Sequence, residues 1–307
     1  MRVAVLDLGT NTTRVLIADV EDGRVEEVDR RTTVTRLGQG VDATGRLAEE
    51  AELRVFEALA GYRALIDEHG TDRIVAVATS AIRDAENGEA FRTEVRERFA
   101  IDAKTISGAE EARLTFLGAT SARAGAEPTL VLDIGGGSTE LVVGTPRNAP
   151  TFDVSTQAGS VRQTERHLTE DPPAHDQLAE LTEEVRAIIA EAVPAEVRSE
   201  TAGGIAVAGT ATSLAAISQE LDPYDPDRVH GFQLDRGEVE RILALLAALP
   251  LEERRGVVGL HPDRAPTIVA GVAILLEVMR AFGLQRFETS EADILHGAAL
   301  DAAATER

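Results

Sequence analysis

Short apolar runs alternate along the chain with longer stretches in which apolar residues recur every three or four positions. The runs are rich in β-branched residues and end at turn-forming residues, which is typical of buried strands, and the longer stretches are typical of amphipathic helices. We predict strands at 2–6, 14–20, 103–106 and 286–289 and within "RIVAVA", "TLVLDI" and "GGIAVA", helices at 49–68, 88–99, 109–118, 177–192, 235–248, 267–282 and 291–304, and a loop at Thr79–Arg83. This alternation of strands and helices predicts an α/β fold.

One pattern occurs twice. The stretch "RVAVLDLGTNTTRVLIADV" reads as strand, turn and strand, and "TLVLDIGGGSTELVVGT" repeats it 126 positions later. The shared positions are Val5, Leu6, Asp7, Gly9 and Thr13 in the first copy and Val131, Leu132, Asp133, Gly135 and Thr139 in the second. A repeat on this scale predicts a duplicated α/β chain, in which each half begins with a hairpin whose turn carries Asp and Gly.

The repeat divides the chain into residues 1–122 and residues 123–307. The stretch "SARAGAEP" (Ser121–Pro128) is the expected hinge, because it is rich in small and turn-forming residues. The chain has 307 residues, of which 43% are apolar, and this is enough to build two buried cores. The final helix is expected either to stay with the second half or to pack back on the first.

Composition excludes several classes of partner and site. The net charge of −22 argues against nucleic acid and anionic membranes, because both would be repelled. No apolar run is long enough to span a membrane, and "MRVAVLDLGT" does not read as a signal peptide, so we expect a cytoplasmic enzyme. The absence of cysteine excludes disulfides, thiolate catalysis and cysteine–zinc sites. The six histidines are dispersed, which argues against a zinc centre.

The stretch "LDIGGGSTEL" combines a strand-end carboxylate with a bare turn and two hydroxyls. Three consecutive glycines allow backbone N–H groups to converge on an anion, and Ser138 and Thr139 add hydroxyl donors. Asp133 would repel a phosphate unless a divalent cation lay between them, and Mg²⁺ commonly binds a few carboxylates, water and phosphate oxygens. The stretch is neither a Walker A loop nor a dinucleotide-binding turn, since the chain continues as a strand.

The duplicated phosphate-binding hairpins resemble the actin and sugar-kinase superfamily, which implies an actin-like fold with a cleft between two domains. Within that superfamily the chain resembles the exopolyphosphatase/guanosine pentaphosphate phosphohydrolase family. Five motifs carry this resemblance, in order and at fitting separations: "DLGTNTTR", "ATSAIRDAEN", "ISGAEEARLTFLG", "DIGGGSTEL" and "GSVRQTE". It covers nearly the whole chain and implies a phosphohydrolase that activates water.

The resemblance implies two catalytic residues. Glu111, in "SGAEEA", would be the base that activates water, while Glu110 would point about 100° away around the helix. Without the resemblance, either glutamate reads as a first-turn residue that favours the helix dipole. Arg83 would neutralise charge on the transferred phosphoryl group. Its alternative is a surface salt bridge with Asp84 or Glu86.

The resemblance also implies sets of binding residues. The expected phosphate-binding residues are Asn11, Thr12, Ser80, Gly135, Gly136, Gly137 and Ser138. The expected ligands of Mg²⁺ or Mn²⁺ are Asp133, Glu140 and Asp7, although Glu140 also reads as an exposed strand residue. Arg14 is expected either to contact the ligand or to fix the first turn.

Two positions depart from the family pattern. Pro266 follows Arg264-Ala265 where the family commonly has aspartate, and His296 stands in "DILHG" where many relatives carry arginine. Proline fits the start of a helix, so the fold should survive. Both changes put nucleotide or distal-chain binding in question rather than hydrolysis.

The expected reaction is metal-assisted hydrolysis of the terminal phosphate of inorganic polyphosphate. Guanosine pentaphosphate is the alternative substrate for the same chemistry. From other classes, an actin-like kinase and a non-catalytic nucleotide sensor stay open, and so do a monomer and a homodimer. Longer relatives carry additional C-terminal helical domains, and a chain of this length is expected to act on shorter polyphosphates.

Overall fold

The computed structural model describes residues 1–305, which form two compact units. Unit 1 combines Met1–Arg123 with the segment that begins at Asp293, and unit 2 is the continuous segment Ala124–Ala292. Each unit is described by itself. The chain therefore leaves unit 1 once and returns to it for its final helix.

Unit 1 is built on a five-stranded sheet with the order β3-β2-β1-β4-β5. The strands β1, β2 and β3 form an antiparallel meander, and β4 and β5 add to β1 in parallel. Its elements are β1 (Arg2–Leu8), β2 (Thr12–Glu21), β3 (Arg24–Val34), α1 (Val41–Thr44), α2 (Glu49–His69), β4 (Arg73–Ala78), α3 (Ser80–Asp84), α4 (Gly88–Phe99), β5 (Ala103–Thr105), α5 (Gly108–Thr120) and α14 (Ile294–Ala304).

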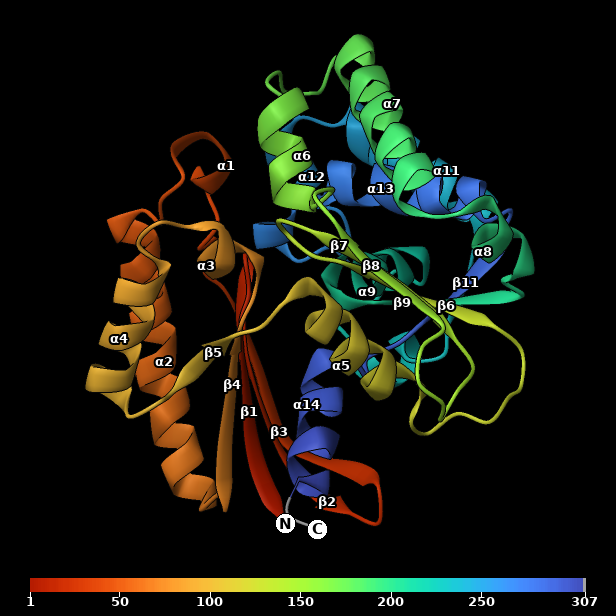
Figure 1. Ribbon diagram of the computed structural model, residues 1–307. Helices are drawn as coiled ribbons and strands as arrows, with labels where there is room; N and C mark the ends of the chain where they lie inside the picture. The colour runs from red at the N-terminus through yellow and green to blue at the C-terminus, as the bar shows by residue number, and fades with distance from the viewer. Residues whose placement is uncertain (306–307) are drawn as a thin grey trace. The chain divides into compact units, whose positions relative to one another are not determined.

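The two faces of this sheet are covered by different helices. Figure 1 shows α2 and α4 on one side and α5 and α14 on the other. Because side chains alternate along a strand, Leu6 and Leu8 of β1 join the core under α2 and α4, while Val3 and Val5 join the core under α5 and α14. Asp7 falls in the same alternation as Val3 and Val5, so the sequence directs its carboxylate towards the α14 side.

The helices α5 and α14 pack against each other with their backbones in close contact. A Cβ atom on Gly118 would lie 1.9 Å from the carbonyl oxygen of Asp293, and a Cβ atom on Gly297 would lie 1.8 Å from that of Leu114. These distances leave no space for any side chain. The two glycines therefore fix the position of the last helix against the helix that carries Glu111.

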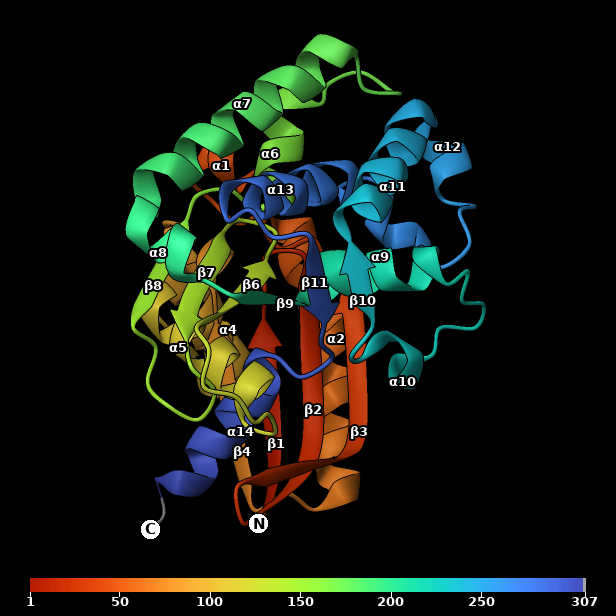
Figure 2. The same cartoon turned by 90° about the vertical axis from the view of Figure 1, so that its right-hand side faces the viewer.

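Unit 2 contains a six-stranded sheet with the order β10-β11-β9-β6-β7-β8. Figure 2 shows β10 and β11 side by side next to β9. The elements are β6 (Thr129–Ile134), β7 (Thr139–Gly144), β8 (Phe152–Thr156), α6 (Ser160–His167), α7 (His175–Ala192), α8 (Ala195–Glu200), β9 (Gly203–Val207), α9 (Ala208–Ser218), α10 (Pro226–Val229), β10 (Gln233–Asp235), α11 (Arg236–Ala248), α12 (Leu251–Arg254), the 3-10 helix η1 (Pro262–Arg264), α13 (Ile268–Ala281) and β11 (Arg286–Thr289).

The core of unit 2 lies between one face of its sheet and the helices α7, α11 and α13. Leu130, Leu132 and Ile134 of β6 point into this core, together with apolar residues of the three helices. Val131 and Asp133 alternate with them and point to the opposite face. Asp133 therefore lies off the main core of its unit, at the end of a buried strand.

Most predicted elements are present, with bounds that differ by a few residues. The predicted loop at Thr79–Arg83 is wrong, because Ser80–Asp84 forms the helix α3, whose small residues Ser80 and Ala81 are buried. The predicted final helix begins later than expected, at Ile294, where the side chain of Asp293 caps it. The prediction also left out β3, whose many charged residues disguise a strand at the edge of the sheet.

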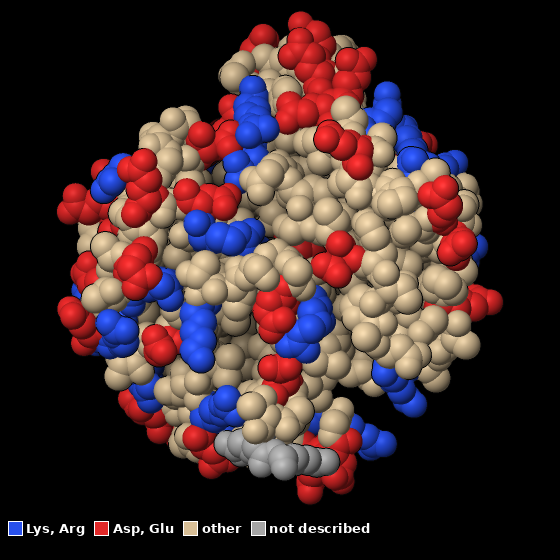
Figure 3. Space-filling model, viewed as in Figure 1, with Lys and Arg blue, Asp and Glu red and all other residues tan. Residues whose placement is uncertain are grey.

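Acidic and basic side chains are interspersed on the face drawn in Figure 3. The excess of acid in the sequence therefore does not gather there into one patch of a single sign. No helix within residues 1–305 is long and apolar enough to cross a bilayer.

The contact between α5 and α14 gives a stability prediction. Gly297→Ala should lower the free energy of unfolding by about 1–3 kcal/mol, because the new methyl group overpacks the backbone of α5. Urea denaturation measures this change. The matched control is Gly61→Ala in α2, where nothing lies within 4 Å of the added Cβ. It should stabilise by roughly 0.5–1 kcal/mol, and equal effects of the two substitutions would contradict the close contact.

Candidate active site

The first turn joins β1 to β2 in unit 1. The Gly9 N–H donates to the carbonyl of Thr12 at 3.0 Å and closes the turn. A Cβ atom on Gly9 would lie 2.8 Å from that same carbonyl oxygen, so only glycine fits. The carbonyl of Asn11 accepts hydrogen bonds from the N–H groups of Thr35 and Arg36, which hold the turn from outside. Both predicted phosphate-binding residues of this turn, Asn11 and Thr12, are half-buried.

The second turn joins β6 to β7 in unit 2 and is closed in the same way. The Gly135 N–H donates to the carbonyl of Ser138 at 2.9 Å, at positions equivalent to Gly9 and Thr12 in the sequence repeat. Ser138 itself is buried, with 1% of its surface exposed. The duplication seen in the sequence therefore extends to the hydrogen bond that shapes each turn.

The helix α6 holds the second turn from one side. The N–H groups of Ser160 and Val161 donate to the carbonyls of Gly135 and Gly136, and Arg162 Nε donates to the carbonyl of Gly137 at 2.8 Å. In a trans peptide the N–H points away from the carbonyl of the same unit. The three N–H groups that follow these carbonyls are therefore turned away from α6, and such a row of donors is suited to bind an anion.

Two carboxylates lie side by side below this turn. Asp133 and Glu140 are directly opposite each other in the β6–β7 ladder, and both are more than nine-tenths buried. Ser155 is opposite Glu140 in the β7–β8 ladder and donates to Glu140 Oε1 at 2.7 Å. Like charges at directly opposed positions repel each other, and a cation bound between them would reduce that repulsion. Glu140 is therefore not the exposed strand residue that its pattern also allowed.

A divalent cation fits this pair by the chemistry of its donors. Mg²⁺ takes one or two protein carboxylates and fills its other positions with water and phosphate oxygens. Within residues 1–305 no three His, Cys, Asp or Glu side chains form a metal-binding group, so a complete protein cage is not formed there. Two buried carboxylates near a row of N–H donors have donor chemistry that is compatible with a divalent cation and a phosphate.

The equivalent pair in unit 1 has a different composition. Asp7 and Arg14 are directly opposite each other in the β1–β2 ladder, at the positions that correspond to Asp133 and Glu140. Arg14 donates to Asp7 Oδ2 through Nε at 3.0 Å and through Nη2 at 2.7 Å. The Oδ1 atom of Asp7 is buried without a hydrogen-bond partner among the described residues. Burial raises the pKa of Asp7, while Arg14 acts in the opposite direction.

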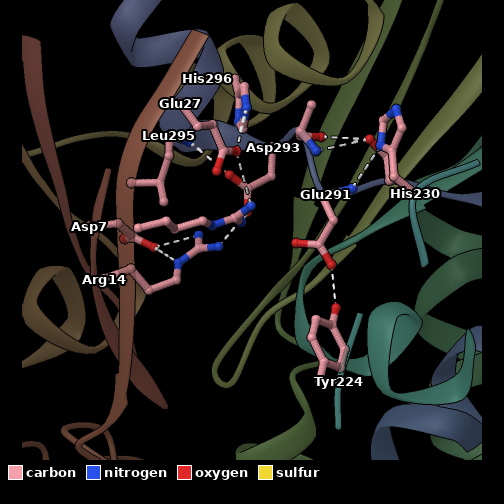
Figure 4. Close-up of polar contacts among 12 residues, drawn as sticks. Asp7, Arg14, Glu27, Tyr224, His230, Glu291, Asp293, Leu295 and His296 are labelled. Atoms are coloured by element: carbon pink, nitrogen blue, oxygen red, sulfur yellow. Dashed lines mark hydrogen bonds and ion pairs between the residues drawn. The ribbon is translucent and has the colours of Figure 1, made fainter. Parts of the chain in front are cut away.

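Arg14 belongs to a buried charge cluster that joins β1, β2, β3 and the start of α14 (Figure 4). Its Nη1 contacts Asp293 Oδ2, and Arg30 Nη2 lies 3.5 Å from the same oxygen. Burial alone would raise the pKa of Asp293, but Arg14, Arg30 and His296 outweigh it, and the pKa lies at about 2. Of the alternatives for Arg14, the structure shows the one that fixes the end of the first turn.

His296, the residue that departs from the family pattern, lies at the outer end of this cluster. Its Nε2 atom is 3.0 Å from Glu27 Oε1. This hydrogen bond holds the pKa of Glu27 below its usual range. The histidine therefore serves the packing of α14 against β3.

The two neighbouring glutamates of α5 have different partners. Glu111 is buried, and Arg83 Nη1 donates to its Oε2 at 3.2 Å and to the carbonyl of Ile106 at 3.0 Å. Glu110 is half-buried and accepts two hydrogen bonds from Arg113, which hold the pKa of Glu110 below its usual range. Arg113 also reaches Asp301 of α14 at 2.7 Å. Glu111 is therefore the buried member of the pair, and Glu110 belongs to a surface ion pair.

Arg83 and Ser80 both come from α3. The Nε atom of Arg83 is 3.9 Å from Asp84, so the alternative salt bridge is also present, although it is longer than the contact with Glu111. The hydroxyl of Ser80 is 2.7 Å from that of Thr10, and the Ala81 N–H donates to Thr10 at 3.2 Å. The short helix thus links the first turn to the glutamate of α5 within unit 1.

Several residues of these sites were missed in the sequence. Arg162 lies in the motif "GSVRQTE", but the sequence indicates no role for it, although its side chain supports the second turn through the carbonyl of Gly137. Asp293 was not singled out, because nothing in the sequence near it indicates an arginine partner from β2. The spacing of Arg14 from Asp7 did carry a signal, since residues 7 and 14 become opposed once the turn has its observed length.

Comparison with known proteins assigns this arrangement to a family. A model of the Ppx/GppA phosphatase family matches residues 16–306. Exopolyphosphatase 2 of Mycobacterium tuberculosis is 38% identical, and the match covers 98% of each chain.

Two solved structures are similar over the whole chain. The crystal structure of the Aquifex aeolicus member of the Ppx/GppA family has a TM-score of 0.84 and 30% identity, and the match covers 100% of this chain and 99% of that one. The crystal structure of an exopolyphosphatase-like protein has a TM-score of 0.92 and 37% identity, covering 98% of this chain and 97% of that one. These likenesses confirm the predicted fold class, a duplicated actin-like α/β fold.

The buried cluster predicts how stability depends on pH. The folded-state pKa of Asp293, about 2, lies below the 3.8 of an unpaired aspartate, so its stabilisation is complete above about pH 4 and is lost as the pH falls towards 2. Asp293→Asn should therefore lower the unfolding free energy by about 1–3 kcal/mol at pH 7, because Arg14 loses a buried charged partner.

Urea denaturation of the two proteins between pH 2 and pH 7 measures this difference. Asparagine retains the helix cap, so the comparison isolates the charge. The difference should shrink below about pH 4. A difference that stays constant down to pH 2 would show that the ion pair does not contribute.

Proposed function

The chain belongs to the Ppx/GppA phosphatase family, and on that premise we propose that it is an exopolyphosphatase, which hydrolyses the terminal phosphoanhydride bond of inorganic polyphosphate. Family membership already bears out the predicted class of enzyme, a phosphatase hydrolase. The choice of polyphosphate is supported by the relative named Exopolyphosphatase 2, which matches over 98% of its own length. The observation that carries the proposed chemistry is the buried Glu111 carboxylate, which Arg83 holds at the start of α5.

Glu111 is proposed to act as the general base. A water oxygen attacks the terminal phosphorus and forms a new P–O bond, the bridging P–O bond breaks, and the shortened polyphosphate leaves with the electron pair. Glu111 accepts the proton of the attacking water and later releases it to solvent. Glu110 is less suited to this role, because it is less buried than Glu111 and both of its carboxylate oxygens accept from Arg113.

The second turn and Arg83 are proposed to stabilise the charge of the phosphoryl group. The N–H groups of Gly136, Gly137 and Ser138 donate to its oxygens, in the orientation that α6 imposes on the turn. Asn11, Thr12 and Ser80 are proposed as further donors from unit 1. The guanidinium of Arg83 adds positive charge beside the base.

Asp133 and Glu140 are proposed to hold the divalent cation, Mg²⁺ or Mn²⁺. A cation bound there would offset the charge of the phosphate oxygens during hydrolysis. We leave Asp7 out of the ligand set, because Arg14 already supplies the positive charge at that position. In this proposal the positive charge beside the first turn is the guanidinium of Arg14, and the positive charge beside the second turn is the bound metal ion.

The first test is phosphate release from polyphosphates of defined length, with guanosine pentaphosphate and ATP alongside. We expect release from polyphosphate without any acceptor. Preferred hydrolysis of guanosine pentaphosphate would identify the alternative phosphohydrolase. Phosphate transfer that needs an acceptor would identify a kinase, and binding without release would identify a sensor.

The same assay tests the base. Glu111→Gln should lower kcat by about 10²–10⁴-fold while polyphosphate still binds, because the amide cannot take the proton. Glu110→Gln is the matched control and should lose at most a few-fold. Inactivity of Glu110→Gln with an active Glu111→Gln would move the base by one residue.

The cation pair predicts how the protein responds to metal. Excess chelator should abolish phosphate release, and Mg²⁺ or Mn²⁺ should restore it. Mn²⁺ binding, measured by electron paramagnetic resonance in the absence of substrate, should weaken at least ten-fold in Asp133→Asn and in Glu140→Gln. Asp7→Asn should retain the affinity of the parent protein. Weaker Mn²⁺ binding in Asp7→Asn alone would reverse the assignment of the ligands.

A further inference from the structure

We propose that Asp293 is a positioning residue for hydrolysis. From the start of α14 it fixes the positions of the first turn and of α5, the helix that carries Glu111. The proposal rests on the proposed function, in which Glu111 is the base. Asp293 would contact neither substrate nor metal, and its effect would pass through Arg14 and through the backbone of α5.

The side chain of Asp293 controls Arg14. Its Oδ2 atom accepts from Arg14 Nη1, while the other donors of that guanidinium bind Asp7. A planar guanidinium that is held on two edges has a fixed orientation. Asp7 follows β1 into the first turn, so the orientation of Arg14 determines where the end of that strand lies. Figure 4 shows Asp7, Arg14 and Asp293 in this order.

The other oxygen of the carboxylate determines where α14 begins. Asp293 Oδ1 accepts from the Leu295 N–H at 3.0 Å, which is the usual bond of a helix N-cap. Asp293 is also the first residue of the segment that returns to unit 1. One side chain therefore ties the start of the returning helix to β1 and β2.

The backbone of Asp293 positions α5. Its carbonyl oxygen lies against Gly118, where a Cβ atom would be 1.9 Å away. Glu111 is seven residues before Gly118, which is about two helical turns along the same face. A shift of α14 along or around its axis would therefore displace the carboxylate of Glu111 together with α5.

The energetic reason is that Asp293 supplies a buried negative charge next to two arginines. Asp7, Arg14 and Asp293 are all at least nine-tenths buried, with two carboxylates around one guanidinium and Arg30 as the second cation. A buried charge that loses its partner must move or draw in water. Removing the carboxylate of Asp293 should therefore release Arg14 and loosen both structures that it holds.

The main experiment measures kcat and KM for a short polyphosphate in Asp293→Asn, which keeps the helix cap but not the charge. We expect kcat to fall by about ten-fold or more and KM to change by less than about two-fold. Misplacement of a base by a fraction of an ångström slows the chemical step and leaves ground-state binding largely intact. A folded Asp293→Asn protein with the parent kcat would overturn the proposal.

Two further variants separate positioning from general stability. Asp225→Asn alters the aspartate that caps α10 in unit 2 and should leave kcat unchanged. Arg14→Lys keeps the charge but replaces the planar guanidinium by a single nitrogen, which cannot contact Asp7 and Asp293 on two separate edges, and it should reduce kcat in the same way. The double variant with Asp293→Asn should lose little more than the worse single variant. Fully multiplicative losses would show that the two residues act separately.

Hydrogen exchange gives a readout that does not depend on turnover. The amides of α5 and of the first turn should exchange faster in Asp293→Asn, whereas those of α7 in unit 2 should not change. Unchanged exchange in α5 would overturn the proposal even if kcat falls. If the parent protein releases no phosphate from any substrate, the proposed function fails, and the exchange experiment still decides whether Asp293 positions α5.

Discussion

Unit 1 depends on one requirement, which is that a carboxylate buried at the end of a strand needs a positive partner. Asp7 lies where β1 enters the first turn, and Arg14 from the neighbouring strand supplies the charge. Arg14 keeps a further donor, Nη1, that Asp7 does not take up, and Asp293 accepts from it although Asp293 is distant in sequence. The position of α14, and through it that of α5, follows from this electrostatic requirement.

The duplicated hairpins show how one backbone design serves two purposes. Both turns are closed by the same hydrogen bond, and both place an aspartate opposite the same position of the next strand. Arginine at that position pairs with the aspartate of unit 1, whereas glutamate places a second carboxylate beside the aspartate of unit 2. This difference of one residue is the reason why the proposed metal site lies in unit 2.

The sequence predicted those features that depend on local pattern. Short-range rules predict the equivalence of Asp7 and Asp133, the glycine turns and most of the strands and helices. The family motifs indicated Glu111 for the catalytic role. It could not show that Glu111 is buried while Glu110 is not, because that difference depends on Arg83 and Arg113. The helix α3 was mistaken for a loop, since its burial rather than its periodicity stabilises it. Asp293 was missed because its partners are distant in sequence.

Unit 1 is built from two separate segments of the chain, and this has a consequence for its biosynthesis. Unit 2 is one continuous segment, but one face of the unit 1 sheet is covered by α14, the last helix of the chain. A ribosome delivers the N-terminal strands first, so the part of that face which α14 covers, rather than α5, stays uncovered while unit 2 is made. Unit 1 is therefore started first and finished last. Its closure depends on contacts between residues far apart in sequence, and such contacts form slowly.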